Sequence, residues 1–494
     1  MSVSENDVAL SRARRRISRW RRYGPALFAV EAMGVPSEWN EEKHEGVLDW
    51  QWEASLRLAA DPRDPGGDPR DGRVSVRSGH GSGKTAFAAW SVIWFETCYF
   101  PTRIPCTAPT RHQLEDVLWP EISLWHHRLK EVNPELGALF RWGKERFALV
   151  EEPEASFAAL RTARKENPEA LQGYHMAKIG GGLLLIVDEA SGVDEAIYES
   201  GEGSLSQSGA KVLMLSNPTR LQGYFYDSHH RMRPTWWSIH ADSVNSPFQS
   251  QIFRDNAARR YGKESAYYKV RVLGEFPPSQ SDTVIPLEIA DSAKFRDVQC
   301  YGPIVWGVDC ARFGMDRSAL AKRWGNHQHG KVQSWSGKDT MQVSGLVYHE
   351  WQDTPPHERP VCIAVDVIGI GAGVADRLAE LGLPVLAVNV AESASIKDRY
   401  VRLRDEIWWN SREWLERKNC RLEDDEDLIA ELTCITYKHL SDGRILVESK
   451  EDAKKRGIES PDLADAWNLT FAFGSERIGK TQNEVPDVAE EAGG

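Results

Sequence analysis

The stretch Arg77-Ser-Gly-His-Gly-Ser-Gly-Lys84-Thr85 decides the fold of the first half of the chain. The segment Val74–Ser78 before it predicts a strand, and Lys84–Trp90 predicts the first turns of a helix. In a strand, glycine-rich turn and helix of this order, backbone N–H groups and the helix N-terminus surround phosphate groups. The sequence therefore predicts a phosphate-binding loop on an α/β scaffold, with a nucleotide held by Gly79, Gly81, Ser82, Gly83, Lys84 and Thr85.

Two side chains of this loop carry the predicted chemistry. We expect Lys84 to reach the β- and γ-phosphates of ATP, and the Thr85 hydroxyl to bind Mg²⁺. The strict motif has a glycine where this chain has Ser78, and Gly79 follows one position later. The loop is therefore a mild variant of the standard one.

Two further strands are predicted to end beside the loop. The apolar run Leu183–Val187 is typical of a buried parallel strand and ends in Asp188 and Glu189. We expect Asp188 to hold Mg²⁺ through water, and Glu189 to orient or deprotonate the attacking water. A strand at Lys211–Leu215 leads into Ser216-Asn217-Pro218-Thr219, whose polar groups are placed to face the γ-phosphate. The alternative for this last motif is a simple turn built on Asn-Pro.

The second half of the chain carries a set of carboxylates. The strands predicted at Pro303–Asp309 and Val361–Asp366 both end on aspartate, and Asp462 and Asp465 lie three residues apart at a helix start. Carboxylates gathered from strand ends and a helix start suit two hard divalent cations, which cleave phosphodiesters. Asp309, Asp366 and Asp462 are predicted as primary metal ligands, with Asp465 as a fourth ligand or a supporting carboxylate. Singly, each is also compatible with a turn residue or a helix cap.

Size and composition bound the possible functions. The chain has 494 residues, a formal net charge of -12 and seven cysteines without CxxC spacing, which favours reduced thiols and at least two domains. No apolar stretch approaches the length of a membrane span, and the basic N-terminus lacks the apolar run of a secretory signal. A large basic stripe that would mark a static DNA coat is absent, and the net charge alone does not decide whether the chain binds DNA. A local basic groove remains compatible with this charge.

The pattern along the chain predicts five parts. Short apolar strands alternate with helical segments in each half, which is the α/β signature. The parts are a helical N-terminal appendage (1–45), a P-loop ATPase domain with a mainly parallel sheet (46–245), a linker or lid (246–300), an α/β nuclease domain (301–475) and a disordered acidic tail (476–494).

Three finer expectations follow from local patterns. Residues 254–268 predict a helix, and residues 397–404 open another that either contacts DNA phosphates or forms solvated ion pairs. The nineteen tryptophans, including Trp408 and Trp409, are assigned to packing and interfaces.

These residues resemble the large subunit of the tailed-bacteriophage terminase. The resemblance covers roughly residues 46–473 and rests on several independent motifs in the expected order. They are Arg77–Thr85, Glu169-Ala-Leu-Gln-Gly173, Asp188-Glu189-Ala190-Ser191, Ser216-Asn-Pro-Thr219, Arg271-Val-Leu-Gly-Glu-Phe276 and the carboxylate set, whose order is also similar to ribonuclease-H-like nucleases.

The resemblance implies a function and partners. It implies ATP-driven translocation of double-stranded DNA into a procapsid, and metal-dependent cutting of concatemeric DNA with Mg²⁺ or Mn²⁺. It implies the portal protein and the terminase small subunit as partners, a ring of identical subunits on the procapsid with a monomer in isolation, and a place in the host cytoplasm without a membrane.

The resemblance also implies roles for individual residues. Ser216 and Asn217 are similar to the motif that couples hydrolysis to DNA movement. Arg77 is similar to an arginine at the γ-phosphate, and Gln51 to the glutamine that reads adenine. Arg161 and Arg164 are candidates for a finger donated to a neighbouring subunit.

Two alternatives belong to other classes. A P-loop helicase-nuclease of DNA repair or phage defence needs a second RecA-like lobe, for which residues 244–304 are too few. A non-catalytic, nucleotide-dependent adaptor predicts no metal-dependent DNA cleavage under any condition.

Overall fold

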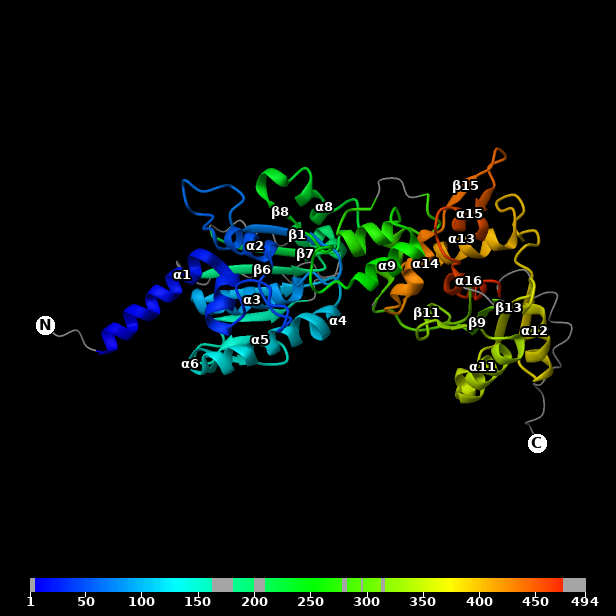
Figure 1. The fold of residues 1–494 in the computed structure, drawn as a ribbon, viewed down its shortest axis with the longest axis horizontal. Coiled ribbons are helices and arrows are strands. Elements are labelled where there is room, and N and C mark those ends of the chain that lie inside the picture. Colours follow the sequence, from blue (N-terminus) through cyan, green and yellow to red (C-terminus); the bar gives the residue numbers. More distant parts are fainter. Residues whose placement is uncertain are drawn as a thin grey trace, which may run out of the picture. The chain divides into compact units, whose positions relative to one another are not determined.

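The structure, a computed structural model, describes residues 5–161, 181–199, 209–277, 282–294, 296–311 and 316–473. The predicted tail (476–494) and the motif Glu169–Gly173 lie outside these residues. The chain forms two compact units (Figure 1). Unit 1 comprises Met1–Asn256 and Tyr268–Ser279, and unit 2 comprises Ala257–Tyr267 and Gln280–Gly494. The segment around residues 246–300 therefore contributes to both units.

Unit 1 is built around an eight-stranded sheet with the order β3-β4-β5-β2-β6-β7-β1-β8. All neighbours from β5 to β8 are parallel, and only the pairs β3–β4 and β4–β5 are antiparallel. Parallel strands end at one edge, so the carboxyl ends of β6, β7 and β1 lie together. The strands are β1 (Arg73–Ser78), β2 (Thr102–Thr107), β3 (Phe140–Trp142), β4 (Arg146–Leu149), β5 (Phe157–Leu160), β6 (Gly182–Asp188), β7 (Lys211–Ser216) and β8 (Trp237–Ala241).

Helices pack on this sheet and enclose an apolar core, in which α3 lies against β2, β6 and β7, and α2 against β1 and β8. The strands β6 and β7 are buried along their whole length, as their apolar runs predict. The helical segments are α1 (Glu5–Met33), α2 (Asp49–Ala59), α3 (Lys84–Cys98), α4 (Arg111–Gln113), η1 (Leu114–Leu118), α5 (Trp119–Val132), α6 (Pro134–Ala138), η3 (Ala190–Gly192), α8 (Tyr224–His229), η4 (Arg233–Thr235), α9 (Gln251–Tyr261) and η5 (Tyr268–Leu273).

Helix α1 is broken at Gly24, where φ is 82° and Pro25 follows. A Cβ atom at Gly24 would lie 2.4 Å from the carbonyl oxygen of Ser55, so only glycine fits this turn. The part after the break is buried against α2 and α3. The part before it extends away from the sheet of unit 1, as the blue helix in Figure 1 shows.

Unit 2 contains a second sheet with the order β11-β10-β9-β13-β14, to which β12 adds by pairing with β10. The pairs of β10 are antiparallel, and β9, β13 and β14 are parallel to one another. An antiparallel start followed by parallel strands on the other side of β9 is the ribonuclease-H-like arrangement predicted for this half. The strands are β9 (Ile304–Asp309), β10 (Arg317–Trp324), β11 (His327–Gln328), β12 (Gln333–Ser336), β13 (Cys362–Asp366) and β14 (Val385–Val388), with a separate hairpin of β15 (Tyr437–His439) and β16 (Ile445–Val447).

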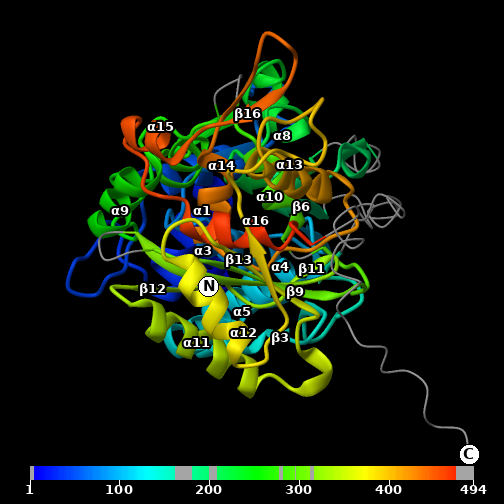
Figure 2. The ribbon, with the colours of Figure 1, turned by 90° about the vertical axis from the view of Figure 1, so that its right-hand side faces the viewer.

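Helices cover both faces of this second sheet. Figure 2 shows α11 and α12 on one face, and α13, α14 and α16 on the other. The helices are α10 (Leu287–Ala293), α11 (Thr340–Asp353), η6 (Pro356–Glu358), α12 (Gly371–Glu380), α13 (Leu403–Glu416), α14 (Glu426–Cys434), α15 (Lys450–Lys455) and α16 (Asp462–Leu469).

Two helix predictions are wrong in their bounds. The helix predicted over 254–268 ends at Tyr261, because Gly262 follows with a φ of 77°. The helix predicted to open at residue 397 begins at Leu403, where Asp405 caps it by accepting a hydrogen bond from the Arg402 N–H. All seven cysteines have free thiols, as predicted. Within the described residues, no helix is long and apolar enough to cross a membrane.

Candidate nucleotide and carboxylate sites

The predicted phosphate-binding loop connects β1 to α3. Gly81 and Gly83 have φ values of 63° and 80°, and Gly83 is the N-cap residue of α3. The Lys84 ammonium donates to the Ser78 hydroxyl at 2.8 Å and to the Gly79 carbonyl at 3.2 Å. Ser78, the departure from the strict motif, thus holds the lysine within the loop. Thr85 follows as the second residue of α3 and is half-buried.

Helix α2 supports one side of the loop. The Trp50 indole donates to the Ser82 carbonyl at 3.0 Å, and the Gln51 amide donates to the Gly83 carbonyl at 3.1 Å. The Gln51 carbonyl oxygen accepts from the Leu48 N–H, so both ends of this side chain bind backbone groups. Gln51 is only 1% exposed, and in this conformation its side chain stabilises the loop through these hydrogen bonds.

The other side of the loop is supported by residues that the sequence did not single out. The Ser243 hydroxyl accepts from the Gly79 N–H, and the Ser246 hydroxyl donates to the Gly81 carbonyl at 2.6 Å. The His80 N–H donates to the Arg271 carbonyl at 2.8 Å. A Cβ atom at Gly79 would lie 2.6 Å from that same carbonyl oxygen, so Gly79 permits this close approach.

The predicted acidic residues lie at the end of β6. Asp188 accepts from the N–H of Glu189, which adopts a left-handed φ of 47°. Burial raises the pKa of Asp188 to about 7, with the Glu189 charge acting in the same direction. Removal from solvent lowers the pKa of Lys84, against the attraction of these two carboxylates. A buried carboxylate beside a lysine and a helix-start hydroxyl suits a Mg²⁺–phosphate group.

The end of β7 connects the acidic strand to the loop. The Ser216 hydroxyl lies 3.4 Å from Glu189 Oε2 and accepts from the Ser191 N–H at 3.0 Å. The Asn217 amide donates to the Ser78 carbonyl at 2.7 Å. Both side chains are buried. Ser216 and Asn217 therefore bind the two predicted halves of the nucleotide site, beyond what a simple Asn-Pro turn requires.

The predicted arginines lie differently. The Arg77 guanidinium donates to the Gly274 carbonyl at 2.7 Å and lies 5.6 Å from the Phe276 ring. Its partner in this conformation is therefore backbone of the segment after η5. Arg161 follows β5 and donates to the Leu160 carbonyl, whereas Arg164 lies outside the described residues.

In unit 2, the aspartates predicted as ligands come from neighbouring elements. Asp309 and Asp366 end the adjacent parallel strands β9 and β13, and Asp462 and Asp465 lie in the first turn of α16. Helix α16 packs directly on β9, because a Cβ atom at Gly307 would lie 2.0 Å from the Ala466 carbonyl oxygen. Gly307 thus permits the approach that brings the four carboxylates into one region.

The ammonium of Lys450, on α15, lies among these carboxylates. Its Nζ atom is 2.9 Å from Asp465 Oδ2, 3.2 Å from Asp309 Oδ2 and 3.8 Å from Asp462 Oδ1. Burial alone would lower the pKa of Lys450, but the surrounding carboxylates raise it well above its usual value. Nothing in the sequence of residues 449–456 distinguishes Lys450 from other surface lysines, so its place among the carboxylates is visible only in the structure.

Asp465 has further partners that distinguish it from the other three aspartates. Its Oδ1 atom accepts from the Trp408 indole at 3.1 Å and lies 3.4 Å from the Arg404 guanidinium. These groups were assigned to packing and to a helix start by sequence. Burial acts to raise the pKa of Asp465, but Lys450 and Arg404 outweigh it and the pKa is lowered.

The buried Glu431 and the half-buried Arg317 orient the start of α16. Glu431 on α14 accepts from the N–H groups of Leu463 and Ala464 at 2.7 and 3.1 Å, and binds the Arg317 guanidinium at 2.6 Å. The Arg317 N–H in turn donates to Asp462 Oδ2 at 2.7 Å. Burial raises the pKa of Glu431 to about 8, with Arg317 opposing it. Asp462 is thus held from both its backbone side and its carboxylate side.

Burial disfavours the ionised form of the other three carboxylates when no cation is bound. Burial raises the pKa of Asp366 to about 6 and that of Asp462 to about 6, and it also raises that of Asp309. The described residues contain no group of three His, Cys, Asp or Glu side chains already arranged to hold a metal ion. The donor set nevertheless consists of hard carboxylate oxygens, and Lys450 supplies a positive charge among them. These residues fit divalent cations once that ammonium withdraws.

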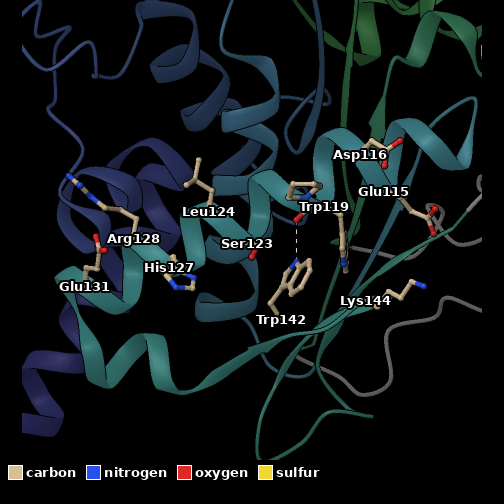
Figure 3. Close-up of a pocket in the computed structure, with 11 residues that line it drawn as sticks. Glu115, Asp116, Trp119, Ser123, Leu124, His127, Arg128, Glu131, Trp142 and Lys144 are labelled. Atoms are coloured by element: carbon tan, nitrogen blue, oxygen red, sulfur yellow. Dashed lines mark hydrogen bonds between the residues drawn. The ribbon is translucent and has the colours of Figure 1, made fainter. Parts of the chain in front are cut away.

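Cavities adjoin the carboxylates. One of about 450 Å³ is bordered by Asp309, Asp366, Lys450 and Asp465, and another of about 340 Å³ by Asp309, Asp462 and Lys450. A larger cavity of about 840 Å³ lies in unit 1 beside α5 and β3 (Figure 3). There the Trp142 indole donates to the Trp119 carbonyl at 3.1 Å. None of the residues predicted for catalysis borders it.

Three comparisons relate this chain to known proteins. No protein-family model matches the chain. A probable terminase large subunit of Enterobacteria phage P7 is 29% identical over 444 residues, which span 85% of this chain and 87% of that protein. The large terminase of a thermophilic bacteriophage is 13% identical with a TM-score of 0.40, over 86% of this chain and 98% of its own. The nuclease domain of the large terminase subunit of bacterial virus Sf6 is 19% identical with a TM-score of 0.34, over 39% of this chain and 100% of its own.

Proposed function

We propose that this chain, a relative of the phage terminase large subunits over most of its length, is a viral DNA-packaging enzyme. The phage P7 protein confirms the resemblance predicted from the motifs. Unit 1 hydrolyses ATP to drive double-stranded DNA into a procapsid, and unit 2 cuts concatemeric DNA. The observation that carries the proposal is the presence of a phosphate-binding loop and a buried carboxylate group on separate sheets of one chain.

In the motor, we assign the loop residues Gly79, Gly81, Ser82 and Gly83 to the phosphates of ATP. Lys84 leaves its contacts with Ser78 and Gly79 to neutralise the β- and γ-phosphates. Thr85 and Asp188 hold Mg²⁺, and Glu189 orients the attacking water. The contacts of Ser216 with Glu189, and of Asn217 with the Ser78 carbonyl, support a coupling role, because they connect the end of β7 to both the acidic strand and the loop.

Two nucleotide contacts in the proposal require movement. Arg77 reaches the γ-phosphate only if its guanidinium leaves the Gly274 carbonyl. Gln51 can bind adenine only if its side-chain amide first breaks its hydrogen bond with the Leu48 N–H or with the Gly83 carbonyl. We assign Arg161 or Arg164 as the finger for a neighbouring subunit, as the resemblance implies.

In the nuclease, Asp309, Asp366 and Asp462 are the residues that would hold two divalent cations, with Asp465 as a fourth ligand or a supporting carboxylate. Bound Mg²⁺ or Mn²⁺ supplies an activated water and stabilises the leaving oxygen. The chain's own residues orient the carboxylates: Glu431 and Arg317 hold Asp462, and Arg404 and Trp408 hold Asp465. Lys450 neutralises the group when no metal is bound.

The wider assignment follows from the same family. It places residues 46–245 as the motor, 246–300 as the connection and 301–475 as the nuclease. The partners are double-stranded DNA, the portal protein and the small subunit, with a homo-oligomeric ring on the procapsid in the host cytoplasm. The helicase-nuclease alternative lacks support, because the described residues of 246–303 contain no strand from which to build a second RecA-like lobe.

Two single-site variants of the full chain, each expected to lose only one of the two activities, test the proposal. Asp366→Asn should abolish Mn²⁺-dependent plasmid nicking and leave DNA-stimulated ATP hydrolysis intact, and Glu189→Gln should do the reverse. Asp376→Asn, on the exposed side of α12, and Glu195→Gln are charge-matched controls outside the two sites, and both activities should survive in them. Nicking that persists in Asp366→Asn, or hydrolysis that persists in Glu189→Gln, contradicts the assigned chemistry.

A further inference from the structure

The first part of α1 carries a basic face that neither catalytic site uses. Seven arginines and no Asp or Glu occur between residues 8 and 30, in a chain with a net charge of -12. Of these, Arg21 is exposed but donates to the Cys98 carbonyl at 2.5 Å and lies against the Tyr99 ring. By helical geometry, Arg14 falls on the opposite side of the helix from the other five.

Five of the arginines share one face of the helix. At about 100° per residue, they fall within an arc of about 120° and extend over about 15 Å of helix axis. All five are exposed. They are Arg12, Arg15, Arg16, Arg19 and Arg22, and we call them the arginine face.

Little negative charge neutralises the arginine face. Arg19 pairs with Glu31 at 2.8 Å, and Arg15 donates to the Ser11 hydroxyl at 3.2 Å. Arg16 lies 4.8 Å from the Trp20 ring. Among side chains that the structure describes, no carboxylate pairs with Arg12, Arg15, Arg16 or Arg22. These guanidinium groups are available to bind an external anion.

The base of this helix is fixed in unit 1. Trp20 is 3% exposed, donates to Glu31 Oε2 at 2.9 Å and lies edge-on to Phe28, with the ring centres 5.0 Å apart. The Trp94 indole donates to the Trp20 carbonyl at 2.9 Å. The arginine face thus lies on a helical segment that extends from this fixed base (Figure 1), so the guanidinium groups are already arranged along a helix.

We infer that the arginine face binds the phosphate backbone of double-stranded DNA. Regularly spaced guanidinium groups on a straight helix match a linear array of phosphates, which each arginine can bind with paired N–H groups. Among the side chains that the structure describes on the opposite face, the apolar ones are Leu10 and Ala13, beyond the buried Trp20 and half-buried Ile17, and Arg14 lies beside them. That apolar area is too small for insertion into a protein groove or a lipid surface. The inference rests on the proposed function, in which DNA is the substrate.

The test is the salt dependence of DNA binding by the full chain, measured by fluorescence anisotropy with a duplex of arbitrary sequence in EDTA, which prevents cutting. The variant that removes charge from the arginine face is Arg12→Gln/Arg15→Gln/Arg16→Gln, and we call it the arm variant. The control removes the same charge from exposed residues elsewhere in unit 1, as Lys130→Gln/Arg141→Gln/Lys144→Gln. Circular dichroism and DNA-independent ATP hydrolysis check that both variants are folded and retain their nucleotide site.

The arm variant should bind DNA at least tenfold more weakly at moderate salt. The slope of log affinity against log salt should fall by about 2 to 3, because each lost phosphate contact removes about 0.9. The control should keep the wild-type slope.

Other outcomes overturn the inference. Equal slopes in wild type and arm variant, or an equal fall in both variants, would show that the arginine face makes no specific phosphate contact. Loss of small-subunit binding in the arm variant with unchanged DNA affinity would assign the face to a protein partner instead. A wild-type chain that binds no DNA under any condition contradicts the proposed function itself. This failure can be told apart from failure of the inference, because it is seen in the wild-type chain, where the arginine face is intact.

Discussion

Lys450 Nζ lies 3.2 Å from Asp309 Oδ2, where it holds together carboxylates that would otherwise repel one another. An ammonium and a divalent cation cannot occupy the same carboxylates, so lysine and metal compete. If the proposed site binds metal, Lys450 must leave these carboxylates first, and the prediction that follows tests this competition.

Lys450→Ala should bind Mn²⁺ more tightly than wild type, by roughly tenfold or about 1.4 kcal/mol, since the competing cation is gone. Without metal, the same variant should unfold at a lower temperature, because its carboxylates lose their counter-charge. Calorimetric titration with Mn²⁺ and the Mn²⁺-induced shift in Tm measure both effects. Lys454→Ala is the matched control, because Lys454 lies on the same helix and pairs with Asp316 at 3.2 Å. An unchanged Mn²⁺ affinity in Lys450→Ala contradicts the competition.

Glu431→Gln should weaken Mn²⁺ binding by roughly tenfold, again about 1.4 kcal/mol. The amide cannot accept from the start of α16 and pair with Arg317 as the carboxylate does, so Asp462 loses its fixed orientation. The ATPase rate of unit 1 should not change. Glu416→Gln, an exposed residue of α13, is the control. A variant with normal Mn²⁺ affinity and only a lower Tm would show that Glu431 stabilises the fold without positioning the site.

Gly307→Ala should abolish DNA nicking and leave ATP hydrolysis in place. The added methyl group would lie 2.0 Å from the Ala466 carbonyl oxygen, so α16 must shift away from β9 and carry Asp462 and Asp465 with it. Overpacking of this kind costs about 1–3 kcal/mol. Gly345→Ala, in α11 with nothing within 4 Å of its new methyl group, should be neutral or slightly stabilising. Nicking at the wild-type rate in Gly307→Ala would contradict the close packing of α16.

Glu96→Gln should stabilise unit 1 at pH 8 and have little effect near pH 4.5. Glu96 is buried, which raises its pKa from 4.5 to about 8, and its Oε1 atom has no hydrogen-bond partner among the described residues. A folded-state pKa above the unfolded value means that the carboxyl contributes stability below pH 4.5 and loses it as the pH rises through 8. The neutral amide avoids this loss.

Thermal unfolding at the two pH values measures the effect of Glu96→Gln, and we expect a Tm higher by roughly 3 °C or more at pH 8. Glu53→Gln, on the exposed side of α2, controls for a general effect of charge. A difference between Glu96→Gln and wild type that does not change with pH would show that Glu96 is not protonated in the folded chain.

The sequence alone determined those features that depend on neighbours in the chain. Glycines with positive φ, a lysine at a helix start and apolar runs ending in aspartate specify their own local structure, so Gly81, Gly83, Lys84, Asp188, Asp309 and Asp366 lie where the patterns predict. Parallel strands then bring their carboxyl ends to one edge, which is why the sequence predicts that these side chains gather at one edge of each sheet.

Only the tertiary structure decided which groups surround those residues. Lys450, Glu431, Arg404 and Trp408 come from elements far from the aspartates in sequence, and nothing local distinguishes them from other charged or packing residues. The same holds for Ser243 and Ser246, which follow β8 in the sequence and hydrogen-bond the backbone of the predicted phosphate-binding loop. Buried charges and backbone groups are stabilised by hydrogen-bond partners. Which residues serve as these partners depends on how distant segments pack together, and the order of residues along the chain does not show it.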